Sequence, residues 1–260
     1  MAAPRWAMLA GALIAVAIVG AMLWPLSTGP EASAAGLPVP PRGEVIAAFA
    51  ADRHPVWVIS HLGGGTSVLD ALSTHVPFAV NKLTWWCPRP RVIEDPFHGA
   101  RYNERGEPIG GPAPGGLRTY AFLVQDDRLF IGEASAEKPV SPSAGGAAAG
   151  CNAADGPLVH DYTTLPEAES PVRARSADDG WMRLHATLVP VPETRSGLLC
   201  LNRVADDACA EVGLPGIEHL LSTPPDRAAE SIAAWTDTDW LVHVLDGRIV
   251  EVSLLVELEE

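Results

Sequence analysis

The sequence predicts a mainly β fold, in which an antiparallel β domain follows one N-terminal transmembrane helix and precedes a C-terminal α+β region. Three observations favour this architecture. Gly and Pro number 24 each among 260 residues, a composition typical of turns and short strands rather than of a helical bundle. One long uncharged apolar run stands near the N-terminus. Beyond it, short apolar segments alternate with turn residues, as expected of strands.

The apolar run over 6–24 contains no charged residue. As a helix its nineteen residues rise about 28 Å, close to the hydrocarbon thickness of a bilayer. Arg5 is the only nearby basic side chain, so residues 1–5 are expected in the cytoplasm and the bulk of the chain outside it, in a single-pass cell-membrane protein. A cleaved signal peptide is the alternative, because Ala32-Ser33-Ala34 fits a small-residue cleavage site. The length of the run favours the anchor.

The rest of the chain divides by composition. A Pro- and Gly-containing linker over 25–42 leads into a β domain over 43–133, and a low-complexity linker over 134–157 leads into the C-terminal region over 158–260. In the β domain the clearest apolar runs are 56–59, 117–124 and 128–131, with a hairpin turn over 125–127. In the C-terminal region we expect strands over 180–191 and 240–258, a hairpin turn at Asp246-Gly247, and a helix over 226–235.

The charge balance restricts the partners. Lys and Arg total 18 against 32 Asp and Glu, a formal net charge of −14, and the pI is about 4.9. Nucleic acids are thereby disfavoured, because phosphate binding requires a basic surface. The acidic surface favours a basic protein partner, of which a cytochrome is one example.

Four cysteines fit an oxidising compartment. None belongs to a C-x-x-C pair, which excludes a zinc ribbon, a thioredoxin motif and a C-x-x-C-H haem site. Cys200 and Cys209 are close enough in sequence to close a local loop, and Cys87 with Cys151 would then form the second pair. The sequence alone establishes neither pairing.

Between Gly43 and Gly132 the chain resembles the Rieske iron–sulfur domain. The resemblance is carried by the run His98-Gly99-Ala100-Arg101-Tyr102-Asn103 and by a later loop made of Gly110, Gly111, Pro112, Ala113 and Pro114. It covers about a third of the chain. Rieske domains have a cluster-binding loop ahead of a G-P-A-P loop, followed by a β-hairpin, so the resemblance implies an antiparallel β domain.

The resemblance also implies the positions of the cluster ligands, C-x-H in a first loop and C-x-x-H in a second. Here the first loop reads Ser73-Thr74-His75 and the second runs from Asp95 to His98. Both histidines are retained, whereas Ser73 and Asp95 replace the cysteines. A Rieske cluster needs two thiolates on one iron and two imidazoles on the other, and oxygen donors substitute poorly for thiolate. We therefore expect no [2Fe–2S] cluster and no other cofactor.

Two other interpretations of these loops remain open. His75, His98 and Asp95 form the donor set of a mononuclear iron or zinc site with an enzymatic role. A working electron carrier with altered ligands is the second alternative. The interpretation we favour is that of a scaffold, in which the histidines form hydrogen bonds. Phe78 and Phe97 stand where the family has an optional disulfide between the loops, so apolar contact is expected to hold them together.

The resemblance extends to the Rieske subunit of quinol–cytochrome and related respiratory or photosynthetic complexes, which also has an N-terminal helix and a hinge. It implies a membrane redox complex as partner. Without a cluster, this chain is expected to be an accessory or structural subunit rather than an enzyme. The loop over 112–114 and residues 158–260 are its expected docking surfaces.

Overall fold

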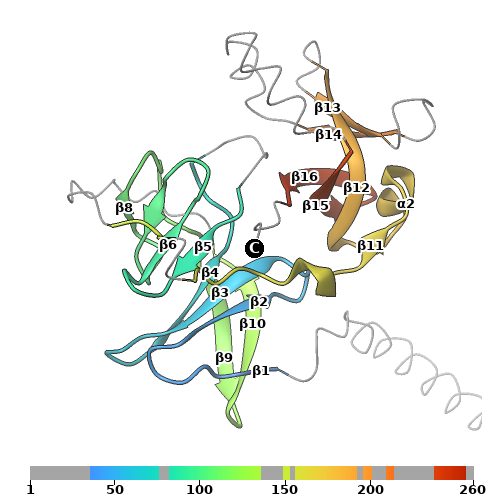
Figure 1. Cartoon of the computed structure of the whole chain (residues 1–260). Coiled ribbons are helices and arrows are strands. Elements are labelled where there is room, and N and C mark those ends of the chain that lie inside the picture. Colours follow the sequence, from blue (N-terminus) through green and yellow to red (C-terminus); the bar gives the residue numbers. More distant parts are fainter. Residues whose placement is uncertain are drawn as a thin grey trace, which may run out of the picture. The chain divides into compact units, whose positions relative to one another are not determined.

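The computed structural model describes residues 36–75, 82–135, 149–152, 156–191, 196–200, 209–213 and 237–255. They fall almost entirely within one compact unit, Leu37–Glu260, and about half of them are in strands (Figure 1). The prediction of a mainly β fold is therefore confirmed. The predicted membrane span over 6–24 lies outside the described residues, and no helix within those residues is long and apolar enough to cross a membrane.

The strands from β1 to β10 make up what we call the first β region. A three-stranded antiparallel meander forms its centre. Its strands are β2 (Val45–Phe49), β3 (Pro55–Ser60) and β4 (Thr66–Asp70). Successive side chains of a strand point to opposite faces. On β3, Trp57 and Ile59 pack into one apolar cluster, whereas Val56 and Val58 pack into another. Because β3 is covered on both faces, its sequence reads as a continuous apolar run.

Two further sheets complete this region. One has the order β1-β10-β9, with β1 (Leu37–Pro38), β10 (Arg128–Ala134) and β9 (Tyr120–Gln125). The other contains β5 (Trp85–Cys87), β6 (Val92–Glu94), β7 (Arg101–Tyr102) and β8 (Pro108–Gly110). β1 comes from the last part of the predicted linker over 25–42, where a Pro-rich composition conceals a short strand that pairs with Leu129 and Arg128.

Both expected hairpin turns are present. Asp126 and Asp127 have φ values of 50° and 59°, and Asp246 and Gly247 have φ values of 50° and 68°. Two consecutive residues with positive φ are the signature of a type I′ turn, which matches the twist of antiparallel strands. These turns join β9 to β10 and β15 (Thr238–Leu245) to β16 (Arg248–Leu254).

The C-terminal region is built on a six-stranded sheet. Its order is β11-β12-β13-β14-β16-β15, and the additional strands are β11 (Glu167–Ala168), β12 (Gly180–Val191), β13 (Ser196–Cys200) and β14 (Cys209–Gly213). β12 also pairs with β15, which closes five of the strands into a ring around Leu184, Trp240 and Val242. The helix α2 (Pro171–Arg175) packs beside it. The helix predicted over 226–235 lies outside the described residues.

Candidate functional site

Three loops of the first β region meet at the positions that the resemblance singled out. The first loop follows β4, the second joins β6 to β7, and the third follows β8. Gly111 in the third loop has a φ of 72°, and a Cβ atom there would lie 2.0 Å from the carbonyl oxygen of Gly99 in the second loop. Pro112 O lies 3.0 Å from His75 Nδ1 in the first loop. The third loop therefore contacts both of the others.

Asp95 closes the second loop on itself. Its carboxylate is fully buried and accepts hydrogen bonds from the backbone N–H groups of Phe97 and His98, each at 3.0 Å. Its Oδ2 atom also lies 3.0 Å from His98 Nδ1. A buried carboxylate is stable only where hydrogen bonds or charges compensate its lost hydration. The loop supplies these partners internally.

Ser73 occupies a comparable buried position in the first loop, where only 4% of its surface is exposed. Its hydroxyl lies 3.1 Å from the hydroxyl of Tyr102 on β7. The backbone N–H of Thr74 donates to the same Tyr102 oxygen, also at 3.1 Å. Burial raises the pKa of Tyr102 although these hydrogen bonds lower it, so the phenol remains protonated at neutral pH. Tyr102 thus ties the first loop to the four-stranded sheet.

The two retained histidines lie side by side. The ring centroids of His75 and His98 are 5.4 Å apart in an edge-to-face arrangement. The Nδ1 atom of each ring already has a hydrogen-bonding partner, Pro112 O for His75 and the Asp95 carboxylate for His98. Hydrogen bonds therefore join Ser73, His75 and Pro112, and separately Asp95 and His98, while a ring contact brings the two histidines together. Phe97 is 39% exposed, and Phe78, its expected apolar partner, lies outside the described residues.

A different trio brings its ligand atoms together. Within the described ranges, the group of three His, Cys, Asp or Glu residues whose donor atoms all lie within 4.8 Å of one another is Cys87, Glu94 and Cys151. His75, His98 and Asp95 do not form such a group there. The cysteines of this trio are joined in a disulfide with a Cα–Cα distance of 5.3 Å. The second disulfide joins Cys200 to Cys209 on β13 and β14, so the prediction of disulfides is confirmed.

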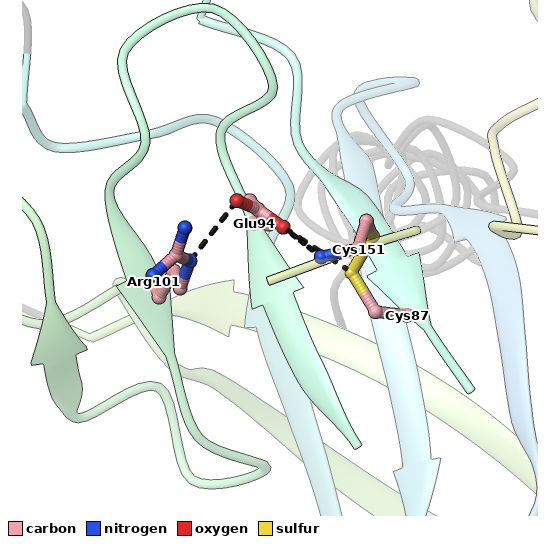
Figure 2. The surroundings of a disulfide bond; sticks show 4 residues. All are labelled: Cys87, Glu94, Arg101 and Cys151. Carbon is pink, nitrogen blue, oxygen red and sulfur yellow. Dashed lines mark hydrogen bonds and ion pairs between the residues drawn. A yellow bond between two sulfur atoms is a disulfide. The ribbon is translucent and has the colours of Figure 1, made fainter. Parts of the chain in front are cut away.

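Glu94 lies between the first disulfide and Arg101, as Figure 2 shows. Its Oε1 atom accepts a hydrogen bond from Arg101 Nε at 3.0 Å. Its Oε2 atom accepts the backbone N–H of Cys151 and lies 3.7 Å from Cys87 Sγ. Glu94 and Arg101 are directly opposite each other on β6 and β7. No local sequence pattern marks Glu94, because only the pairing of these strands brings it to the cysteines.

A second polar centre was also not predicted. Nε2 of His54 lies 2.7 Å from the carboxylate of Asp70, and both residues are buried. They line a cavity of about 960 Å³ together with Tyr120, His243 and Glu251. Burial raises the pKa of the Tyr120 phenol. No local motif marks His54, since it meets Asp70 only through the register that pairs β3 with β4.

Known proteins resemble part of this chain. No family model matches it. The cytochrome b6-f complex iron-sulfur subunit of Chlorobaculum tepidum is 32% identical over 76 residues, which are 29% of this chain and 39% of that protein. The subunit of the same name from Chlorobaculum thiosulfatiphilum is 31% identical over 77 residues, 30% of this chain and 40% of that protein. The chain thus spans about two fifths of the length of these curated relatives.

Two solved structures are also similar. The plasma membrane Rieske protein PetC3 from Synechocystis PCC 6803 has a TM-score of 0.30 and 24% identity, over 34% of this chain and 86% of that one. A chain of a hyperthermophilic respiratory complex III has a TM-score of 0.33 and 22% identity, over 48% of this chain and 98% of that one. The similarity in sequence covers 29–30% of the chain and supports a Rieske-like domain within it. The chain carries a Rieske-like domain.

Proposed function

We propose that this chain is a membrane-anchored, extracytoplasmic Rieske-like protein that holds no [2Fe–2S] cluster and serves as an accessory or structural subunit of a membrane electron-transfer complex. The Chlorobaculum relatives are named as subunits of cytochrome b6-f complexes, which supports a redox complex as partner. The apolar run over 6–24 supports the anchor. The net charge of −14 supports a basic partner surface.

The observation that carries the proposal is the state of Asp95. By resemblance this position belongs to a cluster thiolate, yet its carboxylate is fully buried and accepts hydrogen bonds from Phe97, His98 and the His98 ring. Ser73, at the other thiolate position, is bonded to Tyr102. Neither residue offers the soft thiolate that an iron–sulfide centre requires. This donor set does not fit the cluster, and the loops are held by their own hydrogen bonds instead.

The third loop is the proposed docking surface of the first β region. Pro112 and Pro114 are exposed, whereas Ala113 between them is buried. Because the loop is fixed from behind by Gly111 against Gly99 and by the contact of Pro112 O with His75, its exposed prolines form a preorganised surface. Preorganisation lowers the entropic cost of association.

Affinity purification of the tagged full chain from its native membranes tests the accessory role. We expect subunits of a redox complex to be recovered with the chain by mass spectrometry. The His98→Ala variant is expected to keep these partners, because it removes a hydrogen bond worth about 1 kcal/mol and no cluster ligand in use. Pro114→Asp, at an exposed position of the docking loop, is expected to lose them. Loss of assembly in His98→Ala with Pro114→Asp unaffected would refute this role.

One alternative has a specific observation in its favour. The ring centroids of His75 and His98 are only 5.4 Å apart and Asp95 contacts His98, so a small rearrangement of these loops would produce a mononuclear iron or zinc site. That function requires bound metal in the wild type that the His98→Ala variant lacks. An electron carrier with altered ligands requires iron and sulfide together.

A further inference from the structure

Among the described residues, one group of potential metal ligands lies outside the three loops. Cys87 ends β5 and Glu94 ends β6, while Cys151 belongs to the short segment 149–152 that the disulfide joins to this sheet. The ligand atoms of these three residues all lie within 4.8 Å of one another. Figure 2 shows the Glu94 carboxylate between Arg101 and the disulfide.

The carboxylate is oriented before any ligand is present. Glu94 is only 8% exposed, and Arg101 Nε holds its Oε1 atom at 3.0 Å. The Oε2 atom therefore faces the sulfur atoms, 3.7 Å from Cys87 Sγ. Partners that orient a ligating carboxylate in this way are a regular feature of metal sites, where they fix the ligand and tune its affinity.

We infer that Cys87, Cys151 and Glu94 form a Zn²⁺-binding site when their disulfide is reduced. A dithiol reductant supplies two electrons and two protons, the S–S bond breaks to give two thiols, and the dithiol becomes a disulfide. Binding of Zn²⁺ then releases the two thiol protons, because the metal is held by thiolates. Two sulfur ligands and one carboxylate oxygen leave the fourth tetrahedral position to water.

The two cysteines differ in their access to solvent. Cys87 is fully buried, whereas Cys151 is partly exposed, so the ion has access from the side of Cys151. On reduction the two sulfur atoms must separate to the spacing that a common metal imposes. Glu94 and Cys87 are fixed by the pairing of β5 with β6, so the separation falls to Cys151, whose backbone N–H is bonded to Glu94 Oε2. In the oxidised chain the sulfur atoms are bonded to each other and the site is closed.

Cobalt titration of the full chain tests this inference. The purified protein is reduced with a water-soluble phosphine, which is converted to its oxide with oxygen from water as the disulfide becomes two thiols. The phosphine is then removed under anaerobic conditions. We expect one equivalent of Co²⁺ to bind, with a sulfur-to-cobalt charge-transfer band that Zn²⁺ abolishes. The oxidised chain is expected to show no such band.

The second disulfide provides a matched control. Cys200→Ser should leave the band unchanged, because in the described residues no His, Asp or Glu joins Cys200 and Cys209 within 4.8 Å. Cys87→Ser should abolish it, and Glu94→Gln should weaken Co²⁺ binding by about tenfold or more. Circular dichroism verifies that each variant is folded. Absence of the band in the reduced wild type, its persistence in Cys87→Ser, or unchanged affinity in Glu94→Gln would each overturn the inference.

Discussion

The single residue Asp95 accepts hydrogen bonds from backbone N–H groups of its loop. Without it these groups would lack a partner. Replacing it with alanine removes the acceptor for the Phe97 and His98 N–H groups. Each such group left without a partner costs about 1–3 kcal/mol. We expect Asp95→Ala to lower the free energy of unfolding by about that amount or more, measured by urea denaturation.

Asp95→Asn is the matched control for this substitution, because one amide oxygen remains to accept the backbone N–H groups. Its loss of stability should be clearly smaller than that of Asp95→Ala. Equal effects of the two substitutions would contradict the assignment of Asp95 as a loop-closing acceptor.

The His54–Asp70 pair predicts a pH dependence of stability. Burial by itself lowers the pKa of His54, but the charge and hydrogen bond of Asp70, together with the charges of Asp52 and Glu251, raise it above 6.5. A group whose pKa is raised in the folded state stabilises that state fully below its unfolded pKa. This contribution is lost as the pH rises through the folded pKa.

Comparison of the wild type with Asp70→Asn isolates this contribution from other histidines, such as His243, whose pKa burial lowers. Near pH 6 we expect Asp70→Asn to be less stable than the wild type by about 1–3 kcal/mol. The difference should narrow as the pH rises to about 8. Urea denaturation at several pH values measures it, and a difference that grows with pH would contradict the assignment.

Individual site residues were predictable from the sequence where they stand at a fixed spacing within a motif. His75, His98, Ser73 and Asp95 were found because each stands at a fixed distance from a neighbour in the chain. His54 and Glu94 were not found. Their partners come from other strands, and strand register is a property of the sheet that a local pattern does not encode.

Gly111 allows the close approach of the third loop to the second. A Cβ atom at this position would lie 2.0 Å from the Gly99 carbonyl oxygen. The backbone φ of 72° at Gly111 is also one that residues with a side chain rarely adopt. We expect Gly111→Ala to lower the free energy of unfolding by about 1–3 kcal/mol and to shift the NMR signals of the His98 ring.

Gly115 in the same loop offers the control. A Cβ atom there meets nothing within 4 Å, and its φ lies outside the left-handed region. Gly115→Ala should therefore leave both the stability and the His98 signals close to those of the wild type. If the two alanine variants behaved alike, the close approach of Gly111 to Gly99 would not be what positions the loops.

The elements themselves were predictable where their signals are local. The hairpin turns at Asp126-Asp127 and Asp246-Gly247 follow from residues that tolerate positive φ between apolar runs. β1 escaped prediction because Leu37–Pro38 has linker composition and becomes a strand only by pairing with β10. The closure of β12 on β15 escaped for a similar reason, since those strands lie far apart in the chain.

The chain joins a Rieske-like domain to a second β region that contains the six-stranded sheet. The Chlorobaculum tepidum relative aligns with 76 residues of the chain at 32% identity, and the proposed accessory role also depends on the predicted anchor. The disulfide between Cys87 and Cys151 spans 64 residues of the chain. It attaches the segment that leads into the second region to the four-stranded sheet.

We propose that this Rieske-like domain holds no iron–sulfur cluster. The test is iron and acid-labile sulfide analysis of the full chain purified from its native membranes, combined with an absorption spectrum. We predict neither iron nor sulfide above trace amounts and no visible band. One metal ion per chain without sulfide would instead support the mononuclear site. Iron and sulfide in equal amounts, with the spectrum of an iron–sulfur centre, would contradict the claim and make this protein an electron carrier.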